Sequence, residues 1–415
     1  MSLTDRAAAN RPASRKRGSG AGRDDLRIFL VAGEHSGDAL GGKLMSALSA
    51  RCKGRIHYLG VGGEDMEAAG LASQFPLSDV AVMGPLSILP RLPRIMSRVY
   101  RTVDSAVAAE PDAVVIIDAP EFTHPIAKRI RKRAPFIPII DYVSPSVWAW
   151  RPGRARKMRP YVDHVMGLLP FEPAAHQRLG GPPCTYVGHP LIERLDWMHE
   201  LDPAPLAERL QLDPGRLVLV VLPGSRTSEV TRLMQPFGEA LELLHARRIR
   251  PQVIIPVVAH VRPLVERFAQ SWTVQPHLVE GEEDKFRAFR LAHAALAASG
   301  TVTLQLALAG TPMVVAYKVD GIAAHMRFLL NVPSVVLANL VLEENAFPEL
   351  LQEDCTPEKL ADALEPLLRD SPERRAQLAA LARIPHKMLL DGGTPSDAAA
   401  DIVLDYAVHG RRPDR

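Results

Sequence analysis

A repeated unit runs along this 415-residue chain: a short apolar run rich in β-branched residues, a glycine-containing turn, and a longer amphipathic segment. Continuous apolar runs separated by helical periods indicate parallel strands whose sheets are covered by helices on both faces. The two halves begin alike, with "LRIFLVAGEHSGDALGGKLMSAL" and "RLVLVVLPGSRTSEVTRLM". The sequence therefore predicts an α/β protein with two Rossmann-like, doubly wound domains that face each other across a cleft. The apolar runs are 26–32, 112–118, 136–143, 163–169, 216–223, 251–258, 294–298 and 312–317.

A proline-containing break near residues 199–205 separates the two halves, each long enough for its own core. Residues 1–24 are rich in Arg, Ser, Gly and Ala, which predicts a disordered basic tail without the apolar core of a secretory signal. The patterns over 357–408 are helical and are expected to close the second domain. The predicted domains are 25–200 and 201–385, followed by a C-terminal helix and tail at 386–415.

Residues 291–317 contain no charged side chain, and this run of 27 residues is long enough to span a membrane. It also contains Ser299, Gly300, Thr301 and a Gly-Thr-Pro break. We therefore expect a buried strand at 294–298, a short helix at 299–309 and a second buried strand at 312–317. Ser299 is a plausible N-cap for that helix, whose free amides would attract an anion in an uncharged pocket.

Composition excludes some functions. The net charge of +3 gives no strong field for nucleic acid, and Cys52, Cys184 and Cys355 have no metal-ligand spacing. No Asp-x-Asp pair occurs, which disfavours a transferase that holds a metal–nucleotide complex with two aspartates. We expect no metal and no cofactor, so that helix amides and arginine stabilise any departing phosphate.

Two turns suggest a diphosphate site. "LPGSR" offers backbone amides near Ser225 and the planar charged fork of Arg226, although a strand-to-helix turn often needs glycine for its geometry alone. "ASGTVTLQ" adds Ser299, Gly300 and Thr301, with Gln305 placed to reach a sugar hydroxyl; the alternative is an N-capped buried helix.

Carboxylates follow two strands of the first half. In "GEHSGD", Ser36 can hold a phosphate or hydroxyl, whereas Asp38 can simply cap the helix. In "IDAPEFTH", Asp118 is either a helix cap or a general base, with Glu121 and His124 as rival bases.

Two further segments combine basic and apolar residues. Residues 82–101 read as a membrane-interface element or as an amphipathic helix packed on its own sheet. Residues 141–163 interleave tryptophans with arginines, a pattern that suits nucleic acid, an acidic small ligand or a lipid head group. The membrane-facing candidates are Met83, Leu86, Ile88, Leu89, Arg91 and Arg94.

Taken together, these segments resemble the lipid-A-disaccharide synthase family over roughly residues 26–385. The resemblance rests on "VAGEHSGD", "GVGG", "AVMG", "IDAPEF", "YVSPSVWAW", "LPFE", "VGHP", "LPGSR", "SGT" and "NL…PELLQE". It implies a glycosyltransferase-B fold and transfer from UDP-2,3-diacylglucosamine to 2,3-diacylglucosamine 1-phosphate, in the cytoplasm at the inner-membrane surface. No nucleic-acid partner is expected.

The resemblance also implies roles for single residues. Asp118 matches the proposed base of an inverting transfer. The expected donor-binding residues are Ser225, Arg226, Gly281, Ser299, Gly300, Thr301 and Gln305. The expected acceptor-binding residues are Ser36, Gly37, Asp38, His189 and Asn339. The 25–200 domain would face acceptor and membrane, and the 201–385 domain would bind the UDP-sugar.

Three positions depart from the family pattern. Gln305 stands where the family usually has Glu, Ser87 where it often has Glu, and Thr123 where it often has Asn. A glutamine accepts one ribose hydroxyl instead of two, so UDP binding should weaken. The alternatives are a UDP-sugar epimerase, the transferase that builds the peptidoglycan lipid precursor, or a non-catalytic nucleotide-binding protein of the membrane surface.

Overall fold

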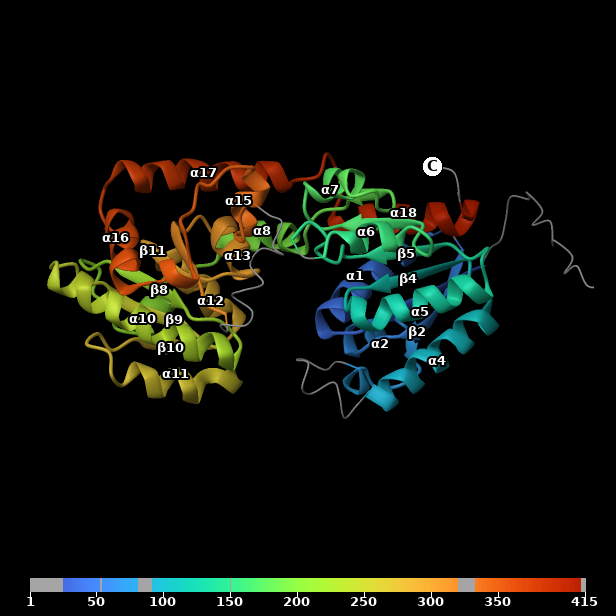
Figure 1. The fold of residues 1–415 in the computed structure, drawn as a ribbon, viewed down its shortest axis with the longest axis horizontal. Helices are drawn as coiled ribbons and strands as arrows, with labels where there is room; N and C mark the ends of the chain where they lie inside the picture. The colour runs from blue at the N-terminus through green and yellow to red at the C-terminus, as the bar shows by residue number, and fades with distance from the viewer. Residues whose placement is uncertain (1–24, 53, 81–91, 150, 320–332, 412–415) are drawn as a thin grey trace, which may run out of the picture.

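The computed structural model describes residues 25–52, 54–80, 92–149, 151–319 and 333–411, which form two lobes (Figure 1). The first lobe contains a parallel sheet of seven described strands in the order β3-β2-β1-β4-β5-β6-β7. The central strand at Ala113–Ile117 is an uninterrupted apolar run, and both it and its neighbour at Ile139–Tyr142 are buried throughout, as expected for a sheet covered on both faces. Its strands are β1 (Asp25–Ala32), β2 (Arg55–Val61), β3 (Ala72–Ser73), β4 (Ala113–Ile117), β5 (Ile139–Tyr142), β6 (His164–Gly167) and β7 (Cys184–Tyr186).

Helices cover both faces of this sheet. One face packs on α1 (His35–Arg51) and α18 (Pro395–His409), and the other on α4 (Leu92–Ala109), α5 (Pro120–Arg133) and α6 (Gly153–Met158). The short helices α2 (Glu64–Ala68) and α7 (Glu172–Arg178) lie at the ends of strands. Side chains alternate between the two cores along β1, where Ile28 and Leu30 face α1 while Phe29 and Val31 face α4 and α5.

The second lobe repeats this architecture with six described strands in the order β10-β9-β8-β11-β12-β13. They are β8 (Val218–Leu222), β9 (Gln252–Pro256), β10 (His277–Val279), β11 (Ala294–Ala298), β12 (Met313–Tyr317) and β13 (Glu349–Leu351). One face packs on α10 (Thr227–Ala246), α11 (Arg262–Ala269) and α16 (Pro357–Leu367). The other packs on α8 (Leu195–Glu200), α9 (Ala204–Arg209), α12 (Glu282–Leu291), α13 (Val302–Leu308), α15 (Leu337–Leu342) and α17 (Pro372–Met388).

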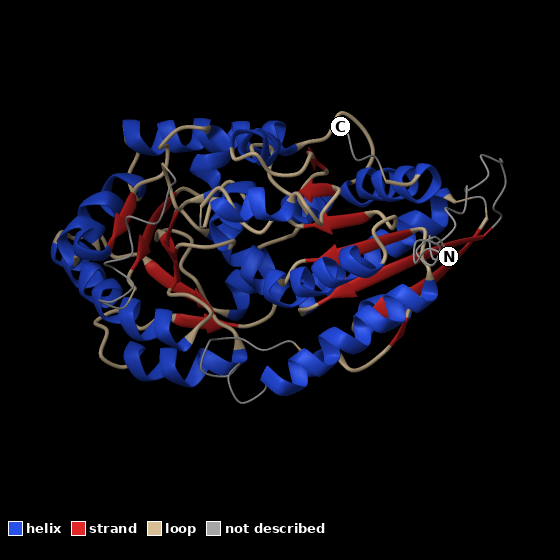
Figure 2. Cartoon of the chain, turned by 45° about the vertical axis from the view of Figure 1, so that its right-hand side comes forward, coloured by secondary structure: helices blue, strands red, loops and turns tan. Residues whose placement is uncertain are grey.

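The strand order reverses at one place in each sheet, between β1 and β4 and between β8 and β11. Parallel strands that run on both sides of such a reversal leave a crevice at their carboxyl ends, where ligands of open α/β sheets bind. The two doubly wound, Rossmann-like folds that the apolar runs predicted are confirmed (Figure 2).

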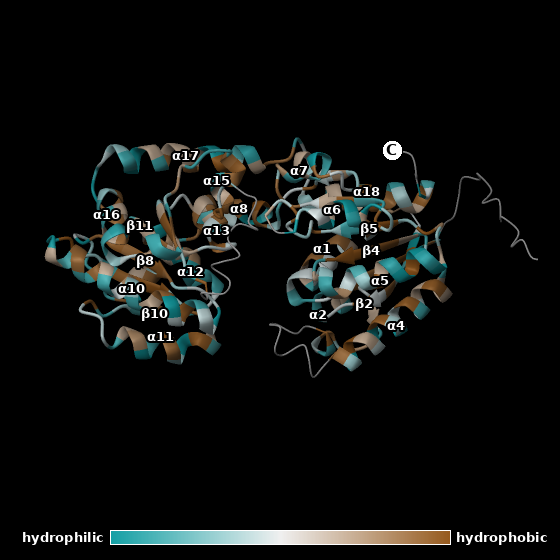
Figure 3. Cartoon of the chain, in the orientation of Figure 1, coloured by the Kyte–Doolittle hydropathy of each residue, from teal (hydrophilic) through white to brown (hydrophobic). Residues whose placement is uncertain are grey.

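The uncharged run at 291–317 folds as strand β11, helix α13 and strand β12, as predicted. Both strands lie in the apolar cores of the second lobe, and Figure 3 draws the apolar residues of the chain in brown. Within the described residues, no helix is long and apolar enough to cross a membrane.

The C-terminal helices do not all belong to the second lobe, which corrects the expectation for 357–408. Helices α16 and α17 pack on the second sheet, but α18 returns to the first lobe and lies against α1 (Figure 1). Val403 of α18 is fully buried in the same core as Leu44 and Leu48 of α1. Arg51 of α1 binds Asp401 at 2.8 Å. A periodic apolar face shows that a helix is covered, but not which sheet covers it.

Candidate active site

The turns after β1 and β4 touch each other at the reversal point of the first sheet. The hydroxyl of Ser36 donates a hydrogen bond of 2.8 Å to Oδ2 of Asp118. This close approach requires glycine at position 33, because a Cβ there would lie 2.5 Å from the Cβ of Ala119. The glycine in "GEHSGD" therefore brings a hydroxyl and a carboxylate together at the carboxyl end of the sheet.

The backbone at Asp118 is strained. Asp118 and Ala119 both have left-handed conformations, with φ of 53° and 42°, and such residues cost of order 1–3 kcal/mol each. Three hydrogen bonds hold this turn: the Asp118 amide donates to Tyr142 O (3.0 Å), and the buried Thr123 hydroxyl lies 2.8 Å from Asp118 O and 3.1 Å from Ala119 O. Strain that the surroundings maintain in this way is typical of functional sites.

The two rival bases have other partners. Arg154 donates to Glu121 at 2.6 Å and holds the pKa of that carboxyl below its usual range. His124 is buried, and its ring nitrogens lie 3.0 Å from Tyr161 Oη and 3.2 Å from Asp141 Oδ2. Among the described residues, Asp118 is the one of the three candidates in "IDAPEFTH" whose side chain hydrogen-bonds only to a neutral hydroxyl.

Glu34 is a site residue that the sequence reasoning did not single out. Burial raises the pKa of its carboxyl, the charge of Asp118 raises it further, and the charge of Arg226 lowers it. Glu34 therefore lies within electrostatic reach of a residue from each lobe. Its place directly after Gly33, between strand and helix, was the available signal.

Asp38 caps a helix, but not its own. Its buried carboxylate accepts hydrogen bonds from the amides of Gly63 (2.7 Å), Asp65 (3.1 Å) and Met66 (3.1 Å), which begin α2. Neighbouring Gly37 packs on the carbonyl of Ile117. Asp38 also lines an open cavity of about 720 Å³ together with His35, so an acceptor-binding role for Asp38 stays a prediction.

The "LPGSR" turn does not present its amides to a ligand, which corrects the sequence expectation. Oε2 of Glu229 accepts from the amides of Ser225 (3.1 Å) and Arg226 (3.2 Å), and Arg226 Nη1 donates to Oε1 of Glu229 at 2.8 Å. Gly224, at φ +109°, is required because a side chain there would overlap that carboxylate. The side chain of Arg226 is nevertheless 67% exposed. The signal for this arrangement was a glutamate three residues after the N-cap.

Ser299 is not the N-cap of α13, contrary to prediction. The N-cap is Thr301, without a side-chain cap, while the Ser299 hydroxyl donates to Val335 O at 2.9 Å. Gly300 has φ +153° and open space where a side chain would project, so its backbone is accessible. The sequence placed this turn correctly but gave the capping role to the wrong residue.

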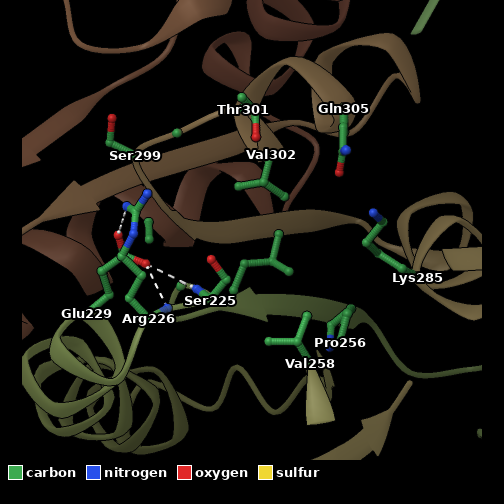
Figure 4. A pocket seen from close by; sticks show the side chains of 14 residues that line it. Ser225, Arg226, Glu229, Pro256, Val258, Lys285, Ser299, Thr301, Val302 and Gln305 are labelled. Carbon is green, nitrogen blue, oxygen red and sulfur yellow. Dashed lines mark hydrogen bonds and ion pairs between the residues drawn. The ribbon is translucent and has the colours of Figure 1, made fainter. Parts of the chain in front are cut away.

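These two turns enclose a pocket of about 430 Å³ at the reversal point of the second sheet (Figure 4). Ser225, Arg226, Ser299, Gly300, Thr301 and Gln305 line it, as the sequence predicted. Gly281 does not; it is the N-cap of α12, which supplies a residue that the sequence reasoning missed, Lys285. Figure 4 shows Arg226 and Ser299 at one end, and Gln305 and Lys285 at the other.

Two predicted acceptor residues make hydrogen bonds within the protein, and their acceptor-binding role stays a prediction. Nδ1 of His189 accepts from the Leu191 amide at 3.2 Å. The Asn339 amide donates to Phe347 O at 3.0 Å and to Glu349 Oε1 at 2.9 Å. Asn339 also lines a separate cavity of about 340 Å³, whose lining does not include Asp118.

Of the membrane-facing candidates, only Arg94 is described. It lies on α4, is exposed, and pairs with Asp79 at 2.8 Å. Residues 81–91, which include Ser87, lie outside the described part of the chain. No group of three or more His, Cys, Asp or Glu side chains in the described ranges is placed to hold a metal ion.

Solved structures with the same fold include two sugar-nucleotide enzymes. UDP-GlcNAc 2-epimerase from Neisseria meningitidis superimposes with a TM-score of 0.61 at 13% identity, covering 92% of this chain and all of that chain. MurG from Acinetobacter baumannii gives 0.53 at 12% identity, covering 92% and 99%. These superpositions show a common glycosyltransferase-B fold. At such low sequence identity they say nothing about the reaction.

Sequence relatives are much closer. Residues 28–388 match the family described as lipid-A-disaccharide synthetase. The lipid-A-disaccharide synthase of Nitrobacter hamburgensis is 49% identical over 395 residues, 95% of this chain and 99% of that protein. That of Bradyrhizobium diazoefficiens is 50% identical over 394 residues, 94% and 99%. The epimerase and precursor-transferase alternatives are therefore not favoured, and the chain belongs to the lipid-A-disaccharide synthase family of glycosyltransferases, which acts in lipid A biosynthesis.

Proposed function

We propose that this enzyme transfers 2,3-diacylglucosamine from its UDP derivative to the 6-hydroxyl of 2,3-diacylglucosamine 1-phosphate, with inversion at the anomeric carbon. The observation that carries the assignment is the opposition of two polar turns. Asp118 and Glu34 follow the strands at the first reversal point, and the pocket around Arg226 follows the strands at the second. The charges of Asp118 and Arg226, one from each lobe, both shift the pKa of Glu34. In a chain of this family, that arrangement supports an acceptor side in the first lobe and a donor side in the second.

Asp118 is the proposed general base. Its carboxylate takes the proton of the acceptor hydroxyl as the oxygen bonds to the anomeric carbon, and the bond from that carbon to the diphosphate breaks, releasing UDP. Positioned base catalysis is worth about 10²–10⁴-fold. The Ser36 hydrogen bond and the strained turn fix the direction of the carboxylate before substrate arrives.

The departing diphosphate is stabilised from the second lobe. Arg226 presents an exposed guanidinium, and Gly300 an accessible backbone, at one end of the pocket. Because Glu229 already occupies the Ser225 and Arg226 amides, the arginine side chain carries more of this task than those amides do. No metal is assigned a part in the reaction.

Both proposed substrates carry acyl chains, so the enzyme works at a membrane surface. We assign it to the cytoplasmic side of the inner membrane as a peripheral protein. Arg94 on α4 supports this assignment, since it belongs to the apolar and basic stretch at 82–101 and its side chain is exposed.

The test is to incubate purified enzyme with both diacylated sugars and detect the disaccharide 1-phosphate by mass spectrometry. We expect one equivalent of UDP per disaccharide, and the same rate with a chelator present. Epimerised UDP-sugar without acceptor would favour the epimerase alternative. UDP binding without product under any acceptor would favour a non-catalytic nucleotide-binding protein.

A further inference from the structure

Within the described part of the chain, Lys285 is the charged group of the donor pocket that has no carboxylate partner. Three charged side chains line the pocket: Arg226, Glu229 and Lys285. Arg226 and Glu229 pair at 2.8 Å, so their charges largely cancel. Among the described residues, the Lys285 ammonium forms no ion pair or hydrogen bond, and it lies 5.0 Å from the centre of the Phe286 ring. The pocket therefore has one uncompensated positive charge.

That charge is partly withdrawn from water. Burial is the main cause that lowers the pKa of the Lys285 ammonium; Glu282 raises it and Arg194 lowers it. Glu282 is itself held by Arg194 at 2.7 Å and is half exposed, so it does not neutralise the lysine. A partly buried ammonium without an acceptor is unfavourable because it has lost hydrogen bonds to water. An oxygen atom of a ligand would replace one of those hydrogen bonds.

The surroundings of Lys285 indicate which part of a ligand supplies that oxygen. Figure 4 shows Lys285 and Gln305 pointing into the same end of the pocket, away from Arg226 and Ser299. Pro256 and Val258 form the nearby wall, and Val258 is 44% exposed. An apolar wall beside a side-chain amide and an ammonium suits a flat ring attached to a hydroxylated sugar, which is the chemistry of a nucleoside.

We propose that Lys285 determines recognition of the donor nucleoside by donating a hydrogen bond to a ribose hydroxyl oxygen beside Gln305. In this chain an amide and an ammonium together replace a single carboxylate: Gln305 accepts from one hydroxyl, and Lys285 donates to the oxygen of the other. This inference rests on the proposed function, because it takes the pocket to bind UDP, and it adds a residue and a contact to it.

The experiment measures calorimetric affinities of the full-length enzyme for UDP, 2′-deoxy-UDP, 3′-deoxy-UDP and inorganic pyrophosphate. The variants are Lys285→Met, which keeps the apolar stem, and Lys387→Met, which removes the same charge from the exposed face of α17. Hydrogen bonds to charged groups predict that Lys285→Met weakens UDP binding about 10- to 100-fold. Lys387→Met should stay within about twofold of wild type, and circular dichroism should show both variants folded.

The deoxynucleotides identify the contact. In wild type, one of the two should bind at least about 10-fold more weakly than UDP, and in Lys285→Met that penalty should shrink to about threefold or less. The affinities of wild type and Lys285→Met for pyrophosphate should differ by only a few-fold, because the lysine would act on pyrophosphate only through its long-range charge.

Three results would overturn the inference alone: equal UDP affinity in Lys285→Met and wild type, an equal loss for UDP and pyrophosphate, or an unchanged deoxy penalty. The second would make Lys285 a phosphate contact. Wild-type enzyme that binds no UDP at all would instead remove the proposed function, and this inference with it.

Discussion

Ser36 and Asp118 are 82 positions apart in the sequence, yet the serine hydroxyl donates a 2.8 Å hydrogen bond to the aspartate carboxylate. The contact joins the turns that follow β1 and β4, the two strands between which the first sheet reverses its order. A carboxylate oriented by one neutral donor keeps its second oxygen free to accept a proton. This geometry is the basis for the first prediction.

Asp118→Asn should lower turnover by about 10²–10⁴-fold while leaving the UDP dissociation constant within about threefold. Asparagine is the informative replacement because it tolerates the left-handed conformation at this position. Disaccharide formation measured by mass spectrometry, with UDP titrated by calorimetry, checks both. Asp104→Asn on the exposed side of α4 is the matched control. Unchanged turnover would move the base to Glu121, His35 or His124.

Thr123→Val should reduce turnover by about 10-fold, because the hydroxyl that holds the carbonyls of Asp118 and Ala119 is lost from a buried position. Thr123→Ser retains the hydroxyl and should recover most of the activity. The measurement is the turnover number beside the melting temperature. If the valine variant turned over as fast as wild type, the strained turn would not depend on this residue.

Gln305→Glu should tighten UDP binding several-fold, since a carboxylate accepts from both ribose hydroxyls whereas the amide accepts from one. Calorimetry at fixed ionic strength gives the comparison, and Gln270→Glu at the exposed end of α11 controls for added negative charge. Equal or weaker affinity in Gln305→Glu would remove the ribose contact assigned to this side chain.

Glu172 should make stability depend on pH. Burial raises the pKa of its carboxyl from 4.5 to about 7, although Trp148 Nε1 and the Leu169 amide donate to it. Between these values the folded state holds a proton that the unfolded state has lost. The unfolding free energy should therefore fall by about 3 kcal/mol from pH 4.5 to 7 and level off above.

Urea unfolding of wild type and Glu172→Gln across pH 4.5–8 isolates this contribution. His164, His176 and His189, whose pKa values burial lowers to about 4, change stability in the opposite direction but are present in both proteins. The glutamine variant should lack the fall between pH 4.5 and 7, whatever its absolute stability. Parallel curves for the two proteins would contradict the assignment.

Val403→Asp should detach α18 from α1, because it places an unpaired carboxylate in a fully buried position. We expect a loss of about 3 kcal/mol or more in the free energy of unfolding of the first lobe. Val408→Asp on the exposed side of the same helix should change stability by less than about 0.5 kcal/mol. Limited proteolysis after residue 388 provides the second readout, since only Val403→Asp should be cut rapidly.

The parts of the fold that local pattern determines could be predicted from the sequence. The strand expected at 294–298 is β11, and the strand expected at 312–317 is β12 less its first proline. Strands such as β2 and β10 were not predicted, because their residues are partly exposed and less continuously apolar. The apolar face of α18 could be covered by the sheet of either lobe. The local sequence pattern does not determine which of the two covers it.

The site was predictable in position but less so in contacts. Ser225 and Ser299 both line one pocket of the second lobe. The hydrogen bonds of this pocket depend on side chains elsewhere, such as Glu229 for the Ser225 amide and Val335 for the Ser299 hydroxyl. Lys285 was not predicted as a site residue because it lies on an ordinary amphipathic helix. Only the tertiary structure places its side chain in the pocket.

The route of the C-terminal segment makes the two lobes topologically unequal. Because β1 and α18 both belong to the first lobe, the second lobe is an uninterrupted stretch inserted into a host that needs both ends of the described chain. A gene fragment for residues 195–388, which includes α8 and its buried Met198, should thus encode a lobe that folds on its own. The host lobe can be produced alone only if α18 is rejoined to it by a designed linker.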